Sequence, residues 1–269
     1  MKLSFNKLVA AASLLAVGAA HAVISPVLTI NEGQTVTYAG WTVSNARGSG
    51  TLVFDTTLKN ALNLAGIQMS AIAPATLTAP LNTKGQYTSI SAASKVTSGS
   101  GIFNTDTQIL QVVGVSSVGG ATMTAISDDG ATNYGGFLSI QNIGADLPTR
   151  TIYADVTGGN GVAAKRLAMW TFCDTCLTGQ TAFPAVVGTT TSVNSVSGLT
   201  ITADAFEYFA TALGLSDFGK SSMAGIKTYG VFNTTISMDV AKAVPEPSTY
   251  ALMGLGLVGI AAVARRRAA

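Results

Sequence analysis

The chain has 269 residues, of which 48% are hydrophobic and 10% are charged, and its formal net charge is +2. An ordinary soluble domain carries about 25% charged residues, so this composition excludes a disordered polyelectrolyte, which needs high charge and few apolar groups. It also argues against nucleic-acid binding, because no face rich in Lys and Arg is available to neutralise phosphates.

The first 22 residues have the three parts of a secretory signal peptide. Two lysines form a short basic start, and residues 8–20 are mostly apolar. Ala20 and Ala22 are the small residues that signal peptidase reads, so we expect cleavage between Ala22 and Val23. The alternative is an uncleaved anchor helix, for which the apolar run is short.

The body of the chain is predicted to consist of short β-strands. Runs of β-branched and aromatic residues lie between clusters of Gly, Asn and Ser. In one run, Ile152, Ala154 and Val156 alternate with more polar residues, which is typical of a strand with one buried face. A turn at residues 158–161 predicts a hairpin with the next run. The predicted strands are 27–30, 35–43, 51–54, 108–115, 121–126, 136–140, 150–156, 167–172 and 230–240.

Two segments have helical rather than strand spacing. Residues 58–65 place apolar side chains at i, i+3, i+4 and i+7 and end at Gly66, and residues 206–213 do the same and end at Gly214. Each follows a strand-like run, and the two align without gaps at an offset of 148 residues. This alignment favours a strand–helix repeat that marks equivalent ends of a two-part β fold. Coincidence between two amphipathic segments is the alternative.

Cys173 and Cys176 are the only cysteines. A zinc site would need two more soft ligands, and the sequence supplies none. Residues 177–184 lack the helical pattern that follows the first cysteine of a thioredoxin-like redox pair. We therefore expect a small local disulfide in an oxidising compartment. A redox-active pair and two free thiols are the alternatives.

The only histidine, His21, lies in the predicted signal peptide, so the mature protein has none. This excludes Ser-His-Asp and Cys-His catalysis as well as histidine metal ligation. We expect a protein that is not an enzyme and that holds no metal and no cofactor.

The carboxylates form no recognisable pattern of a catalytic or metal site. Asp128-Asp129-Gly130 with Asn133 supplies oxygen atoms that calcium prefers, but it lacks the ligand spacing of an EF-hand and is interpreted as a solvated hairpin turn. Glu32 and Glu207 are the only glutamates of the body. A glycosidase needs two opposed carboxylates. Glu207 is instead interpreted with Asp204 as the start of a helix.

Trp41, Trp170 and several tyrosines suggest a sugar-stacking face as one alternative. Each lies in a strand-like run, where packing in the core is the commoner use of an aromatic residue. Asn233-Thr234-Thr235 fits the N-glycosylation pattern, and the many Ser and Thr residues are further candidates for attached sugar.

The C-terminal end combines three unrelated features in a fixed order. Pro245-Glu246-Pro247 precedes sixteen uncharged residues, 249–264, and the cluster Arg265-Arg266-Arg267 follows at once. Sixteen helical residues span about 24 Å, slightly less than a typical hydrocarbon core. The arginines are expected to stay in the cytoplasm, so the sequence predicts a single transmembrane helix with the body outside.

This arrangement over residues 244–269 resembles the PEP-CTERM sorting signal of Gram-negative bacteria. The resemblance implies recognition of Pro245, Glu246 and Pro247 by exosortase, a membrane protease-transpeptidase. It also implies export and an association with extracellular polysaccharide or biofilm.

Together these observations predict a signal peptide at 1–22, a β-rich extracytoplasmic domain at 23–240 and a sorting signal at 244–269. The body carries a net charge of about −2, because the two ends hold five of the basic residues and one acidic residue. The expected fold is all-β, a sandwich-like single domain with two short helices.

The expected function is that of an exosortase-sorted, structural or adhesive protein of the cell surface or extracellular matrix. A secreted module that binds carbohydrate or a small ligand is the alternative. The expected partners are signal peptidase, exosortase, exopolysaccharide and, for the precursor, the inner membrane, with no nucleic acid.

Overall fold

The computed structural model describes residues 25–242 together with residues 252, 253, 255 and 257. The predicted signal peptide, its cleavage site at Ala22 and Val23, the Pro245-Glu246-Pro247 motif and the Arg265–Arg267 cluster lie outside the described residues. Within that part of the chain, no helix reaches the length and hydropathy needed to cross a membrane.

The described residues form a mostly β structure with sixteen strands and three short helices. The helices are α1 (Thr56–Leu64), α2 (Ala203–Ala212) and α3 (Asp217–Ala224). The strands are β1 (Leu28–Asn31), β2 (Thr35–Tyr38), β3 (Trp41–Phe54), β4 (Ile67–Ile72), β5 (Thr76–Thr78), β6 (Ser91–Asn104), β7 (Ile109–Val118), β8 (Gly120–Ala125), β9 (Gly136–Asp146), β10 (Thr151–Gly158), β11 (Lys165–Thr171), β12 (Leu177–Gly179), β13 (Ala182–Pro184), β14 (Gly188–Val196), β15 (Thr200–Ile201) and β16 (Gly230–Lys242).

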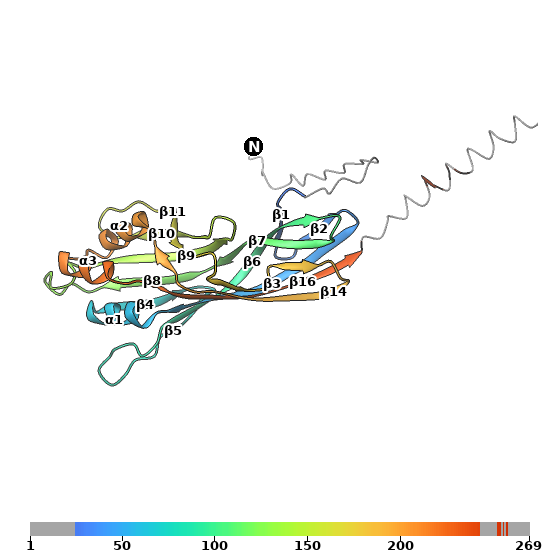
Figure 1. The fold of residues 1–269 in the computed structure, drawn as a ribbon. Helices are drawn as coiled ribbons and strands as arrows, with labels where there is room; N and C mark the ends of the chain where they lie inside the picture. Colours follow the sequence, from blue (N-terminus) through green and yellow to red (C-terminus); the bar gives the residue numbers. More distant parts are fainter. Residues whose placement is uncertain (1–24, 243–251, 254, 256, 258–269) are drawn as a thin grey trace, which may run out of the picture.

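All these strands belong to one curled antiparallel sheet. Its central path runs β12-β14-β16-β3-β6-β7-β9-β10-β11-β15, and the shorter strands pair alongside it. The long strands β3, β6 and β16 have 14, 14 and 13 residues and run between the two ends of the elongated molecule (Figure 1). The three helices lie together at one end, and β16 leads out of the other (Figure 1).

The side chains on the inner face of β16 belong to two separate apolar clusters. Phe232 packs into the larger cluster with the helices, and Ile236 packs into the smaller cluster at the opposite end. Between them the inward-facing residues Gly50, Thr234 and Asn194 lie side by side on β3, β16 and β14. Because these three residues are small or polar, they separate the two clusters within a single sheet.

Several strand predictions are confirmed. Ile152, Ala154 and Val156 are buried on one face of β10, and β10 pairs with β11 as the predicted hairpin. The run 35–43 is not one strand, because Ala39 and Gly40 have φ of 49° and 78° and turn the chain between β2 and β3. Positive φ at two successive residues is the geometry of a tight two-residue hairpin turn.

The prediction of two helices was wrong in number, because α3 is a third. Ser216 is its N-cap, with its hydroxyl accepting from the backbone N–H of Gly219. Only Gly219 and Met223 of α3 are buried, so the helix lacks the apolar spacing that marks the other two. The start of α2 also differs from the prediction, because Thr202 rather than Asp204 is its N-cap.

The two aligned helices end in the same way and pack into the same cluster. Gly66 and Gly214 follow α1 and α2 with φ of 60° and 62°, the left-handed conformation that commonly terminates a helix. Leu62 of α1 and Phe209 of α2 both belong to the larger cluster. The alignment at an offset of 148 residues therefore corresponds to a shared local geometry at one end of the molecule.

Candidate functional site: an apolar hollow at the end of the sheet

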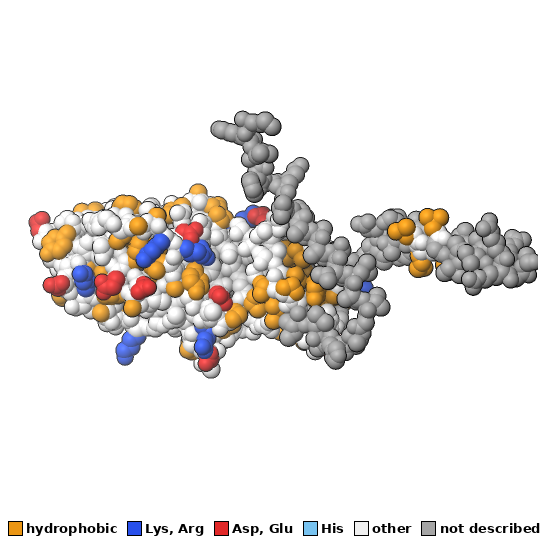
Figure 2. Space-filling model, turned by 90° about the horizontal axis from the view of Figure 1, so that it is seen from above, with side chains coloured by type: hydrophobic (Ala, Val, Ile, Leu, Met, Phe, Trp, Pro, Cys, Tyr) orange, Lys and Arg blue, Asp and Glu red, His pale blue; other side chains and the backbone are white. Residues whose placement is uncertain are grey.

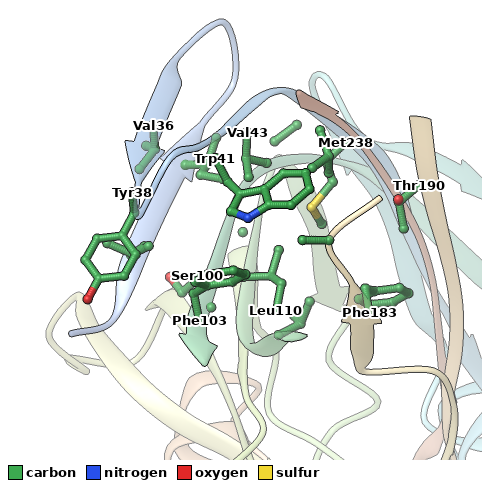
Figure 3. Close-up of a pocket in the computed structure, with 18 of the residues that line it drawn as sticks. Val36, Tyr38, Trp41, Val43, Ser100, Phe103, Leu110, Phe183, Thr190 and Met238 are labelled. Carbon is green, nitrogen blue, oxygen red and sulfur yellow. The ribbon is translucent and has the colours of Figure 1, made fainter. Parts of the chain in front are cut away.

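An open apolar hollow lies at the end of the sheet opposite the helices (Figure 3). The space between its side chains is narrow and opens to solvent, with a cavity volume of about 50 Å³. Strands β1, β2, β3, β6, β7, β13, β14 and β16 contribute to it. The side chains that line it are mostly apolar and include Leu28, Ile30, Val36, Tyr38, Trp41, Val43, Ala46, Phe103, Leu110, Val112, Phe183, Ile236, Met238 and Val240.

The strand register explains why these side chains share one space. Residues that face each other across an antiparallel pair point to the same side of the sheet. Ile30 of β1 faces Gly99 of β6, and Gly99 faces Val115 of β7. A Cβ atom added to Gly99 would meet no other atom within 4 Å. The hollow is open at this position because glycine supplies no side chain to fill it.

Aromatic side chains form much of the wall. The ring of Tyr38 meets the ring of Phe103 edge to face, with centroids 6.3 Å apart. The Nε1–H of Trp41 donates a hydrogen bond to Oε1 of Gln108 at 2.5 Å, which satisfies the polar end of the indole. Figure 3 shows Trp41, Phe103 and Met238 gathered around the same space. The aromatic wall is therefore held in place while its apolar faces remain available.

A cation lies at the rim of this wall. Lys242, the last residue of β16, faces Trp41 across the strand pair, and its Nζ lies 5.4 Å from the centroid of the indole ring. Among the described residues Lys242 makes no ion pair. Two other cations of this end are paired, Lys95 with Glu32 and Arg47 with Asp239. The exposed carboxylate of Asp106, on the turn between β6 and β7, makes no ion pair with the described residues.

The surface around the hollow is rich in hydrophobic side chains. Figure 2 shows a group of them at this end of the body, and others scattered over the rest of the visible face together with Lys, Arg, Asp and Glu. The combination defines a β-rich body with an open apolar end, and the chain continues beyond Lys242 in a C-terminal extension.

Comparison with protein families identifies that extension. The family described as PEP-CTERM protein-sorting motif matches residues 243–267, which begin directly after Lys242. The chain therefore carries a PEP-CTERM protein-sorting motif at its C-terminal end, and the motif implies an exported protein that exosortase processes. No curated protein and no solved structure matches the chain.

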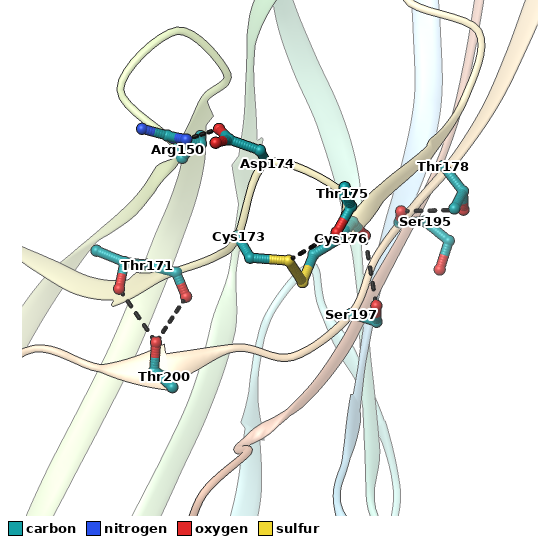
Figure 4. Close-up of a disulfide and its surroundings, with 10 residues drawn as sticks. All are labelled: Arg150, Thr171, Cys173, Asp174, Thr175, Cys176, Thr178, Ser195, Ser197 and Thr200. Carbon is teal, nitrogen blue, oxygen red and sulfur yellow. Dashed lines mark hydrogen bonds and ion pairs between the residues drawn. A yellow bond between two sulfur atoms is a disulfide. The ribbon is translucent and has the colours of Figure 1, made fainter.

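The two cysteines lie on a short turn after β11, away from the hollow. Cys173 and Cys176 are joined by a disulfide (Figure 4). Arg150 forms an ion pair with Asp174 inside the turn, and the backbone N–H of Ser197 donates to the carbonyl oxygen of Cys176 at 3.0 Å. These contacts attach the turn to its neighbours.

The Asp128-Asp129-Gly130 segment forms a hydrogen-bonded loop between β8 and β9. The carboxylate of Asp128 accepts from the backbone N–H groups of Thr132 and Asn133 and from the Thr132 hydroxyl. These hydrogen bonds lower the pKa of Asp128 to about 2, with the one from Asn133 the largest cause. In the described part of the chain, no group of three or more His, Cys, Asp or Glu residues is placed to hold a metal ion.

The remaining residues singled out from the sequence are not brought together. Trp170 is buried in the larger cluster, whereas Trp41 lines the hollow, so the two do not form one sugar-stacking face. Glu32 pairs with Lys95 near the hollow, and Glu207 is exposed on α2 among the helices.

The hollow itself was missed by sequence reasoning. Its residues come from eight strands, and one of its key positions, Gly99, has no side chain. The alternation of Ile236, Met238 and Val240 along β16 is a signal that these residues share a face, but it does not show whether anything covers that face.

Proposed function

We propose that this exported protein acts as a structural or adhesive component of the cell surface or extracellular matrix and is not an enzyme. The observation that carries the proposal is the position of the sorting motif, which starts at residue 243, directly after the last strand of the body. Exosortase processing would therefore release or transfer the folded body through a short connection.

The outer surface supports contact with neutral polysaccharide. Hydroxyl groups meet across neighbouring strands, as in the pair of Thr191 and Ser237, whose oxygens lie 2.8 Å apart. A shallow groove on β3, β12, β14 and β16 is lined largely by hydroxyl and amide side chains, among them Ser49, Thr51, Thr178, Ser195, Asn233 and Thr235. Such groups donate and accept hydrogen bonds, as sugar hydroxyls do.

The intact mass of the protein from its native host tests the processing. We expect a species that begins at Val23 and ends near Pro247, with or without added sugar mass. The double variant Pro245→Ala, Glu246→Gln should retain the C-terminal segment, and the adjacent Ser248→Ala should be processed normally. A wild-type species that retains residues 249–269 would make the protein an ordinary membrane-anchored one.

Fractionation tests the matrix role. The wild-type protein is expected in the extracellular polysaccharide fraction. Thr235→Glu places a charge in the hydroxyl-lined groove and should shift the protein to the soluble fraction, whereas Thr83→Glu in an exposed loop should leave it in place. Equal distribution of both variants and the wild type outside the polysaccharide fraction would contradict the proposal.

A second candidate function is that of a secreted module that binds a small ligand. The apolar hollow supports it, because ligand sites are usually concave, mostly apolar and equipped with few polar groups. A ligand that binds the folded state raises the melting temperature by mass action, so thermal shift measurements test this function directly.

A further inference from the structure

We infer that the apolar hollow binds the acyl chain of a fatty acid, with the carboxylate held at the rim by Lys242. This inference deepens the second proposed function, ligand binding, and names the ligand class. It rests on three independent features of this end of the molecule: the chemistry of the wall, the space at Gly99 and the charge at the rim.

The wall fits a hydrocarbon chain better than a sugar. The polar end of Trp41 is occupied, because its Nε1–H donates a hydrogen bond to Gln108. What faces the space is the apolar surface of residues such as Phe103, Phe183 and Met238. An alkyl chain gains about fourfold in affinity for each methylene group that it buries in such a site.

The space continues along β6 at Gly99. A Cβ there would contact nothing within 4 Å, whereas a Cβ at the next inward glycine, Gly101, would approach Leu110 Cδ1 and the Gln111 carbonyl oxygen at 3.0 Å. The opening is therefore local to Gly99. A single unbranched alkyl chain is the narrowest apolar ligand, so it requires the least widening of such a space.

The rim supplies one unpaired positive charge among the described residues. Lys242 lies over Trp41, and neither of the nearby ion pairs, Lys95 with Glu32 and Arg47 with Asp239, involves it. A carboxylate at the end of an acyl chain is complementary to this ammonium group. An exposed pair of this kind contributes about two- to fivefold in affinity.

The position of the hollow places it near a source of acyl chains. The apolar segment of the sorting motif starts at Thr249, seven residues after Lys242. A fully extended connection of that length spans at most about 25 Å. While the apolar segment is in the membrane, the hollow therefore stays close to the lipid surface.

The full chain in phosphatidylcholine nanodiscs tests the inference with a dodecanoic acid that carries a photoreactive diazirine at its methyl end. After illumination, peptide mapping is expected to place the cross-links on the hollow-lining strands β1, β3, β6 and β16. Unlabelled dodecanoate should compete for this labelling. Labelling spread evenly over the exposed surface, or not reduced by the competitor, would overturn the proposal.

Matched variants test where the acyl chain and the carboxylate of the fatty acid bind. Gly99→Leu should reduce the labelling at least tenfold by filling the hollow, whereas Asn31→Leu, at an exposed position of β1 that faces Ser98, should not. Lys242→Gln should weaken binding of the photoreactive acid about two- to fivefold without affecting binding of the matching photoreactive alcohol. Lys84→Gln should change the binding of neither. Equal labelling of Gly99→Leu and wild type, with both folded by circular dichroism, would exclude the hollow as the site.

Two further outcomes separate the alternatives. Labelling that occurs only after the chain is cut beyond Lys242 would mean that the chain's own C-terminal segment fills the hollow, which would overturn the proposal. Failure of the labelling together with thermal stabilisation by a different small ligand would overturn the fatty-acid assignment and leave ligand binding supported. If neither the labelling nor thermal stabilisation by any small ligand is observed, the second proposed function is contradicted.

Discussion

The two ends of this sheet differ in what covers their inner face. At one end, α1, α2 and α3 pack on the strands, and side chains such as Leu199 and Leu213 are completely buried. At the other end the same long strands carry apolar residues inward, but Leu28 and Trp41 are only half-buried around an open hollow. The comparison shows that inward apolar residues on a continuous strand do not guarantee a closed core. A second layer must cover them.

The largest expected effect comes from deleting a buried side chain at the helical end. Leu213→Ala should lower the free energy of unfolding by about 2–5 kcal/mol, because Leu213 is fully buried and its removal leaves a cavity. Leu28→Ala at the hollow should cost clearly less, since the side chain is already in contact with solvent. Denaturant unfolding of both variants measures the difference, and equal losses would contradict the distinction between the two ends.

Two glycine substitutions test the same difference by adding an atom instead of removing a side chain. A Cβ on Gly48 would lie 2.0 Å from the Thr235 carbonyl oxygen, so Gly48→Ala should destabilise the β3–β16 pairing by about 1–3 kcal/mol. Gly99→Ala projects into the hollow and should be neutral or stabilise by up to about 1 kcal/mol, because it restricts the unfolded chain. Thermal unfolding distinguishes the two, and a marked loss for Gly99→Ala would mean that the hollow is closed in solution.

The cap of α2 gives a smaller effect confined to the helical end. The Thr202 hydroxyl accepts a hydrogen bond from the backbone N–H of Ala205 at 3.1 Å, so Thr202→Ala should cost about 1 kcal/mol. Asp204→Ala removes only a charge near the start of the helix and should cost about 0.3–1 kcal/mol. A larger loss for Asp204 than for Thr202 in urea unfolding would contradict the assignment of the cap.

The smallest expected effect is a dependence of folding stability on pH in the acid range, which arises from one carboxylate at each end. Hydrogen bonds, led by those from Asn133 and from Thr189 respectively, lower the pKa of Asp128 and of Asp239 to about 2. A carboxylate with a lowered pKa in the folded state contributes stability above its unfolded pKa near 4, and this contribution is lost as the pH falls toward 2. Asp128→Asn and Asp239→Asn should each flatten the decline in melting temperature over that range. A profile identical to wild type would show that these hydrogen bonds do not persist in solution.

Local patterns account for the elements that the sequence predicted. Residues 152–156 of β10 alternate between buried and half-buried, and both α1 and α2 combine helical spacing with a terminating glycine, so short-range information was sufficient. The long strand β6 was missed because Ser and Gly dominate it, and α3 was missed because it buries only two residues. Their places depend on neighbours that are distant in the sequence.

The sequence by itself determined the export and sorting character of this protein, because the sorting motif is a contiguous run of residues that can be recognised without knowledge of the fold. It also determined the β-rich class, since alternation and turn residues act over a few positions. Only the tertiary structure decided where the sheet is covered and where it is open. The hollow forms from eight strands, an absent side chain at Gly99 and a lysine at the end of β16, and long-range pairing alone brings these together.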